Sequence, residues 1–295
     1  MFARLAVACL WCLSWLPFRA VSALGVALGT VLHAVPNKRR TIGRVNLRLC
    51  FPLRSDAERE AILRGHFIAF AQMVLEFGYC WFAPPERLKR LVRIDGLEHL
   101  TALPKTTPVI LSMPHFTGID LVGLRLSLET EMVTIYARQK NPWLDTFIRN
   151  KRLRLNTGMV FSRQEGVRSS VRALRDGYRL YYLPDQDHGP RDSVFADFFG
   201  VPAATITGLP RLAGMTRARV LPCYPRRERD GYTLVLEAPL EDFPSDDLTA
   251  DARRMNAVIE QQVLAVPAQY FWLHRRFKTR PQGLPGFYEQ AAAQA

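Results

Sequence analysis

Hydrophobic side chains dominate the beginning of the chain. The stretch Leu5–Val35 contains one fully charged residue, Arg19, which together with Pro17 divides it into two apolar pieces. Because about 20 apolar residues span a bilayer as a helix, the stretch could cross a membrane, or its two pieces could lie in the interface. Three basic residues follow at positions 38–40, and such residues mark the cytoplasmic side of a span. We therefore predict a retained membrane anchor over residues 1–36, with most of the chain in the cytoplasm.

A cleaved signal peptide is the alternative for this stretch. Arg4, the short apolar run and the small residues at positions 21–23 fit such a peptide. Arg19 just before the cleavage site, and the apolar residues that continue after it, argue against cleavage. The retained anchor is therefore the favoured interpretation.

Two helical patterns follow the anchor. Thr41–Leu49 is amphipathic, and arginines recur every four residues on its polar face, at Arg40, Arg44 and Arg48. This face is either simply solvated or contacts phosphate groups beside the anchor. Ser55 followed by Glu58 is typical of a capping box and predicts a helix over Asp56–Phe70 and onward.

From about residue 90 short apolar runs alternate with helical patterns. This alternation predicts an α/β sandwich, with a mostly buried mixed sheet flanked by helices. The predicted strands are Leu91–Ile94, Pro108–Met113, Met132–Tyr136, Leu180–Leu183, Val220–Tyr224 and Thr233–Leu236. The predicted helices are Asp120–Leu128, Trp143–Arg152, Gly166–Arg175, Leu209–Met215 and Thr249–Val263.

The charge of the chain is strongly positive. Forty Lys and Arg residues against 27 acidic ones give a formal net charge of +13, spread along the chain. Such a field attracts nucleic acid, an anionic membrane surface or acidic partners. Five scattered cysteines form no disulfide framework and favour a reducing compartment.

The sharpest candidate for chemistry is a histidine at the end of a predicted strand. Pro114 forces a turn, and His115 follows it where an α/β fold presents its strand ends to ligand. Asp120 lies five residues on, so the two side chains can meet only if His115 is in the turn and Asp120 in the next helix. That arrangement would suit a general base oriented by a carboxylate, although the spacing alone is weak support. The sequence contains no nucleophile elbow, no phosphate-binding loop and no metal-ligand spacing.

Over nearly its whole length the sequence resembles the bacterial lipid A biosynthesis acyltransferases, within the lysophospholipid acyltransferase-like superfamily. The histidine motif alone supports only the superfamily. The narrower resemblance rests on further blocks in this order: Asn46-Leu47 with Cys50-Phe51-Pro52, Tyr136-Ala137-Arg138 with Asn141-Pro142, Leu183-Pro184-Asp185-Gln186-Asp187, Phe198-Phe199-Gly200 with Thr205, and Trp272-Leu273-His274-Arg275-Arg276-Phe277-Lys278-Thr279-Arg280-Pro281.

The resemblance implies a fold, roles and partners. It implies a glycerolipid-acyltransferase-like domain over residues 37–288, with a disordered tail at 289–295. His115 would deprotonate the acceptor hydroxyl and Asp120 would orient His115, with no metal or other cofactor. The donor would be an acyl-carrier-protein thioester, the acceptor a phosphorylated glycolipid, and the location the inner membrane. The candidate substrate-binding residues are Arg138, Arg163, Asp185 and Gln186; Arg138 is the less secure, because many members read Arg-Pro after the tyrosine.

Several arginine clusters fit this interpretation, each of which is also explained by a solvated helix face. The most regular consists of Arg168, Arg172, Arg175 and Arg179, spaced by four, three and four residues and opposite the apolar stripe Val167, Val171 and Leu174. We call Arg168, Arg172 and Arg175 the basic stripe. Two others are Arg149 with Lys151, Arg152 and Arg154, and Arg275 with Arg276, Lys278 and Arg280.

Two alternatives remain open at this stage. One keeps acyl transfer but directs it to another glycolipid, an aminolipid or a glycerolipid. The other is a basic, membrane-anchored binding protein with nucleic acid as its partner, which the charge alone supports. No nucleic-acid-binding signature accompanies that charge, so nucleic acid is not the expected partner.

Overall fold

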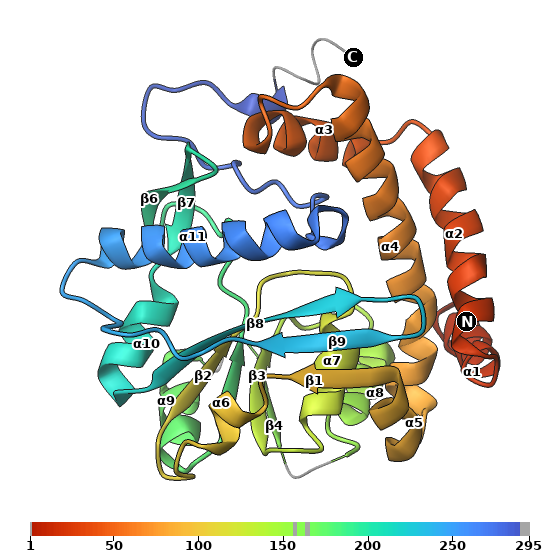
Figure 1. The fold of residues 1–295 in the computed structure, drawn as a ribbon, viewed down its shortest axis with the longest axis horizontal. Helices are drawn as coiled ribbons and strands as arrows, with labels where there is room; N and C mark the ends of the chain where they lie inside the picture. The colour runs from red at the N-terminus through yellow and green to blue at the C-terminus, as the bar shows by residue number, and fades with distance from the viewer. Residues whose placement is uncertain (1, 156–157, 163–165, 290–295) are drawn as a thin grey trace.

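The computed structural model describes residues 2–155, 158–162 and 166–289, and within them seven strands form one mixed sheet (Figure 1). Its strand order is β1-β9-β8-β2-β5-β3-β4. Five strands run parallel to one another, and β1 and β9 run in the opposite direction. The bounds are β1 Val92–Asp95, β2 Val109–Ser112, β3 Met132–Tyr136, β4 Met159–Ser162, β5 Arg179–Tyr182, β8 Arg219–Arg227 and β9 Tyr232–Leu236.

The sheet is buried on both faces. In the central strand β2, Ile110 packs into one hydrophobic cluster, while Val109 and Leu111 pack into the other. The continuous apolar runs of the sequence follow from this burial, because a parallel sheet must be covered on both sides. The predicted α/β sandwich with a mostly buried mixed sheet is confirmed.

Helices cover each face of the sheet. One cluster includes side chains of α3 (Lys38–Cys50), α9 (Gly166–Arg175), α10 (Gly208–Thr216) and α11 (Leu248–Ala265). The other includes side chains of α5 (Pro85–Leu91), α6 (Glu98–Thr101) and α7 (Ile119–Leu126). The long helix α4 (Asp56–Phe82) contributes to both, and α8 (Pro142–Arg152) packs beside it. The predicted capping box is present, since Ser55 and Glu58 bond each other's backbone N–H groups.

The N-terminal stretch differs from the predicted membrane helix. It forms two helices, α1 (Phe2–Leu13) and α2 (Phe18–Ala34), because Pro17 cannot continue the first one. Within the described residues no one helix is both long and apolar enough to cross a bilayer; α2 and α3 would suffice only as a pair bent by 88°. The single N-terminal membrane helix is therefore a correction to the predicted fold.

Helix α2 runs alongside α4 and is packed against it (Figure 1). Gly25 and Gly29 lie at this contact, where an added Cβ would overlap Gln72 and Ile68. Apolar side chains are exposed on α1, on α2 and in the connection between them: Trp11 in α1 and Leu24 in α2 are about half accessible, and 72% of Trp15 in the connection is accessible. The two helices are thus joined to the domain while presenting an unusually apolar surface.

A small antiparallel hairpin lies apart from the main sheet. It consists of β6 (Ser193–Phe198) and β7 (Val201–Ile206), joined by Phe199 and Gly200, both with positive φ. Such a two-residue turn matches the twist of a hairpin, but the local apolar pattern does not predict these strands. Nor does it predict β4, which has only four residues and is half-buried.

Candidate functional site

The order of the strands brings His115 and Asp185 together. Strands β2 and β5 are parallel neighbours, and Ser112 at the end of β2 pairs with Tyr182 at the end of β5. His115 and Asp185 each follow three residues after this pair. The two side chains therefore leave the same edge of the sheet, where open α/β folds bind ligands.

Both oxygens of the Asp185 carboxylate hold His115. Oδ1 lies 2.6 Å from the His115 Nδ1 atom, and Oδ2 accepts a hydrogen bond from the His115 backbone N–H at 3.0 Å. Asp185 is 2% exposed, whereas 21% of the His115 side chain is accessible. Since an ionised carboxylate can only accept, Nδ1 carries the proton. Nε2 makes no hydrogen bond within the described chain, so its lone pair remains available to a ligand.

Charge balance keeps Asp185 ionised. Burial by itself would raise the pKa of this carboxyl group, but the His115 imidazole, its N–H donors and Arg276 outweigh burial and lower the pKa to about 2. Because the folded-state pKa is below the ordinary value of 3.8, the group stabilises the fold above that pH. This contribution is lost as the pH falls towards 2, so Asp185 holds His115 throughout the physiological range.

Two segments fix the loops that carry this pair. The backbone of Gln269–Phe271 bonds antiparallel to His115–Thr117: Thr117 donates to Gln269 and Phe271 donates to His115, both at 2.8 Å. Two residues beyond Asp185, the buried Asp187 carboxylate accepts from the Thr279 backbone N–H at 2.6 Å and hydroxyl at 2.8 Å. The site is therefore built on bonded backbone rather than on free loops.

Asp120 faces a different partner. Gly118 has a positive φ of 92° and starts α7, and the helix turns Asp120 towards α8, where its Oδ1 accepts from Arg152 at 2.7 Å. No hydrogen bond or ion pair joins Asp120 to His115 in the described part of the chain. The predicted His115–Asp120 pair is thus absent from this structure, although His115 lies in the turn and Asp120 in the first helical turn as required.

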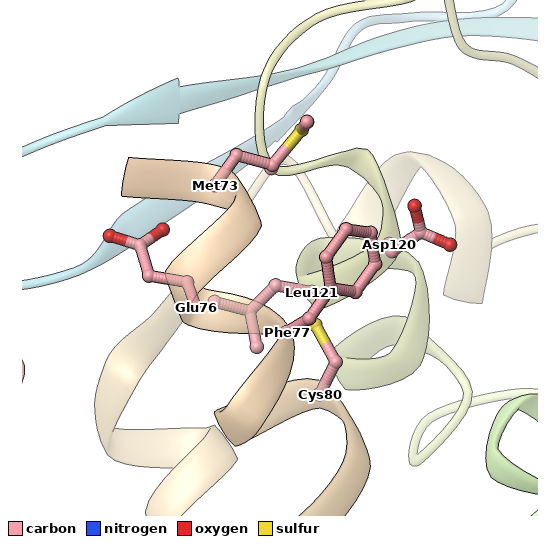
Figure 2. A pocket seen from close by; sticks show the side chains of 7 residues that line it. Met73, Glu76, Phe77, Cys80, Asp120 and Leu121 are labelled. Atoms are coloured by element: carbon pink, nitrogen blue, oxygen red, sulfur yellow. The ribbon is translucent and has the colours of Figure 1, made fainter. Parts of the chain in front are cut away.

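A narrow pocket between α4 and α7 reaches Asp120. Its lining is mostly apolar and comes from Met73, Glu76, Phe77, Cys80, Gly118, Asp120 and Leu121. Figure 2 shows the carboxylates of Glu76 and Asp120 on opposite sides of the pocket, with Leu121 and Phe77 between them. The Glu76 carboxylate already has partners within the protein, because it accepts hydrogen bonds from Arg227 at 2.8 Å and from the Tyr232 hydroxyl at 2.6 Å.

The chain matches known proteins along almost its full length. The family model described as bacterial lipid A biosynthesis acyltransferase matches residues 1–279. The chain belongs to this family. It is 35% identical to the lipid A biosynthesis lauroyltransferase of Escherichia coli strain K12 over 288 residues, 96% of this chain and 94% of that protein.

Two further relatives come from the same organism. The palmitoleoyltransferase is 33% identical over 283 residues, covering 95% of this chain and 92% of its own. The myristoyltransferase is 34% identical over 251 residues, covering 84% and 77%. The names of these acyltransferases specify three different acyl chains, so similarity to them does not identify the acyl chain that this family member transfers.

Two of the other predicted substrate-binding residues of this acyltransferase, Arg138 and Gln186, follow strands of the same sheet. Arg138 is exposed just after β3, a strand on the β5 side of β2. Gln186 is half-buried beside Asp185. Arg163 lies outside the described residues. The sequence placed Asp185 at the site but did not foresee its contact with His115; the missing information was that β2 and β5 are neighbours.

Several basic residues of the predicted clusters serve the fold of the acyltransferase. Arg276 is 3% exposed and donates to Ala204, Thr205 and Asn256. Arg154 donates to backbone carbonyls at the end of α4, including Ala83 at 2.7 Å. Arg179, predicted on the polar face of a helix, is instead 4% exposed at the start of β5 and donates to the Thr107 carbonyl at 2.6 Å. Guanidinium groups bonded in this way support the fold, because a phosphate would have to replace those bonds.

His274 is also a structural residue. Its Nε2 atom accepts from the Asp187 backbone N–H at 3.0 Å. Burial lowers the pKa of His274 to about 4, so the ring stays neutral and keeps this bond. His274 is therefore a hydrogen-bonded residue of the fold rather than a second base.

Proposed function

We propose that this acyltransferase moves a fatty acyl chain from an acyl-carrier-protein thioester onto a hydroxyl of a lipid A precursor. The observation that carries the proposal is the His115–Asp185 pair at the carboxyl edge of the sheet, within a member of the lipid A acyltransferase family. A histidine whose Nδ1 is held by a buried carboxylate has its Nε2 ready to accept a proton.

The reaction follows from this arrangement. Nε2 of His115 takes the proton of the acceptor hydroxyl as the oxygen attacks the thioester carbonyl carbon. Asp185 stabilises the imidazolium that forms and keeps Nε2 directed at the reacting oxygen. The tetrahedral intermediate then breaks its carbon–sulfur bond, and the imidazolium returns the proton to the thiolate. The products are an acyl ester and a free carrier thiol, and no acyl-enzyme forms.

The test of this function measures both products. Purified protein, acyl-carrier protein loaded with a fatty acid and a phosphorylated lipid A precursor should yield free thiol and an acceptor heavier by one acyl group. Thiol release should require the acceptor. Transfer to a glycerolipid or aminolipid, with none to the lipid A precursor, would instead support the alternative acceptor.

The basic stripe on α9 suits an acidic carrier protein. Arg168, Arg172 and Arg175 are exposed, while Ala173 and Leu174 on the other side of the helix are buried. Replacing all three arginines by Gln should raise the KM for carrier protein about tenfold at low salt, with little change in kcat. The difference should shrink as salt rises, since screening removes the same attraction in the parent.

A matched variant separates this docking effect from net charge. Lys89→Gln, Arg90→Gln and Arg229→Gln together remove three exposed positive charges outside α9 and should leave the KM for carrier protein within about twofold. If the α9 variant has the parent's KM at low salt, the stripe is a solvated helix face.

We further propose that the protein works at the cytoplasmic face of the inner membrane. The exposed apolar faces of α1 and α2, followed by basic residues, support this location. Replacing Trp11 and Trp15 by Gln should reduce the membrane-bound fraction on the order of tenfold, because indole rings favour the interface. Cell fractionation with immunoblotting measures it. Val167→Gln with Met215→Gln changes two comparably exposed apolar residues elsewhere and should leave the fraction unchanged.

A further inference from the structure

A broad groove lies between α3 and the first turns of α4, away from His115 and Asp185. Its lining residues are Arg40, Arg44, Leu47, Arg48, Asp56, Ala57, Arg59 and Glu60. Neither His115 nor Asp185 is among them, so the groove is separate from the proposed catalytic pair. Four arginines against two carboxylates leave it with an excess of two positive charges.

One carboxylate is shared among several cations in this groove. Glu60 accepts from Arg40 at 3.0 Å and from Arg44 at 2.8 Å, and its Oε1 lies 3.0 Å from the His33 Nε2 atom. Hydrogen bonding to Arg44, with the help of Arg40, lowers the pKa of Glu60 to about 2. Glu60 therefore stays ionised and offsets only part of the positive charge of the groove.

Donor capacity remains in the groove. Arg48 is exposed and makes no hydrogen bond or ion pair with any residue of the described chain. About half of the Arg44 side chain is accessible, and the buried Nε–H of Arg40 has no partner in the described structure. Guanidinium groups arranged in this way match the oxygens of a phosphate, which they can bind with paired hydrogen bonds.

Exposed apolar side chains flank the groove on both sides. His33 and Ala34 of α2 contact Glu60 and Arg40, and their neighbours Val31, Leu32 and Val35 are exposed. On the other side, Leu53 in the loop between α3 and α4 is 100% exposed. A phosphate-binding groove between apolar side chains has the polarity of a membrane interface, where headgroups lie beside acyl chains.

We propose that this groove binds the phosphate of an anionic membrane phospholipid, with Arg44 and Arg48 as the principal contacts. The inference rests on the proposed membrane location and deepens it. Leu53 and the end of α2 enter the apolar layer beside the bound headgroup. The groove thereby sets the orientation of the domain on the leaflet, while the lipid A precursor binds separately at the sheet edge.

The test is binding to vesicles, which requires no acyl transfer. Vesicles of roughly three parts phosphatidylcholine to one part phosphatidylglycerol are compared with phosphatidylcholine alone. Arg44→Gln with Arg48→Gln should weaken binding to the anionic vesicles about 25-fold, since each arginine near such a surface contributes about fivefold. Leu53→Ser should weaken binding to both kinds of vesicle, and Leu53 supports no core that the change could unfold.

Matched variants and a second ligand decide between the explanations. Lys105→Gln with Arg211→Gln removes two exposed charges from the loop before β2 and from α10 and should change binding less than about threefold. Equal losses in the two double variants would reduce the effect to net charge and overturn the proposal. If the Arg44→Gln, Arg48→Gln variant loses affinity only for vesicles that contain lipid A precursor, the groove is an acceptor site. If it loses affinity only for carrier protein, the groove is a protein-docking site. His115→Ala should bind vesicles like the parent, so failure of the catalytic proposal would be seen separately.

Discussion

Replacement of His115 by alanine should lower the turnover number roughly 10²–10⁴-fold, the usual contribution of a positioned proton acceptor. Within the described residues, Nε2 of His115 makes no hydrogen bond, so the change to alanine removes the base and leaves only Asp185 without its ring partner. The KM for the glycolipid should change little, because one imidazole contributes little to holding a large phosphorylated lipid. Initial rates of acceptor-dependent thiol release measure both constants.

The control for this variant concerns folding. Asp185 would be left as a buried carboxylate with fewer donors, which destabilises the domain. His115→Gln keeps a donor for Asp185 and should fold more like the parent, yet lack the base. Near-parental transfer by a folded His115→Ala or His115→Gln protein would contradict the role of His115.

Replacement of Asp185 by asparagine should give a loss of similar size, about 10²–10⁴-fold in kcat. The two carboxylate oxygens accept from the ring and from the backbone of His115, and an amide has only one oxygen to offer. One of the two donors then faces an NH₂ group, and the ring loses the charge that stabilises imidazolium. The same rate assay, with the variant's thermal stability as reference, measures the effect.

Two comparisons make the Asp185 prediction specific. The losses of Asp185→Asn and His115→Ala should not add in the double variant, because both residues serve one proton transfer. Asp120→Asn should cost less than Asp185→Asn, since Asp120 bonds Arg152 in this structure. If Asp120→Asn abolishes transfer while Asp185→Asn stays near the parent, the pairing expected from the sequence spacing is the catalytic one.

Much of the secondary structure could be predicted from the sequence, because it depends on neighbours along the chain. Met132–Tyr136 and Gly166–Arg175 have the bounds that their apolar periods predict, and the Ser55 capping box begins α4 as expected. The helix after His115 was predicted within one residue of its start. Elements with weak local signals were missed, notably β4 and the β6–β7 hairpin, whose burial comes from distant partners.

The N-terminal apolar stretch shows a structure that composition alone does not predict. Its length and hydropathy fit one spanning helix, but Pro17 ends a helix, and α2 buries a glycine face against α4. The apolar content of a segment indicates how much of its surface can be buried. Whether a given face is buried against lipid or against protein depends on whether the rest of the domain packs on that face.

The sequence by itself determined that His115 follows a strand and that Asp185 follows another, together with the family to which both motifs point. It could not determine which carboxylate holds the histidine, because that depends on the order of strands in the sheet. Strand β5 lies next to β2 although some 70 residues separate His115 from Asp185 in the chain. Asp120 is near in sequence, yet the helical start after Gly118 turns it towards Arg152. Local spacing sets the direction of a side chain within its own element, and only the packing of the whole sheet decides what that side chain meets.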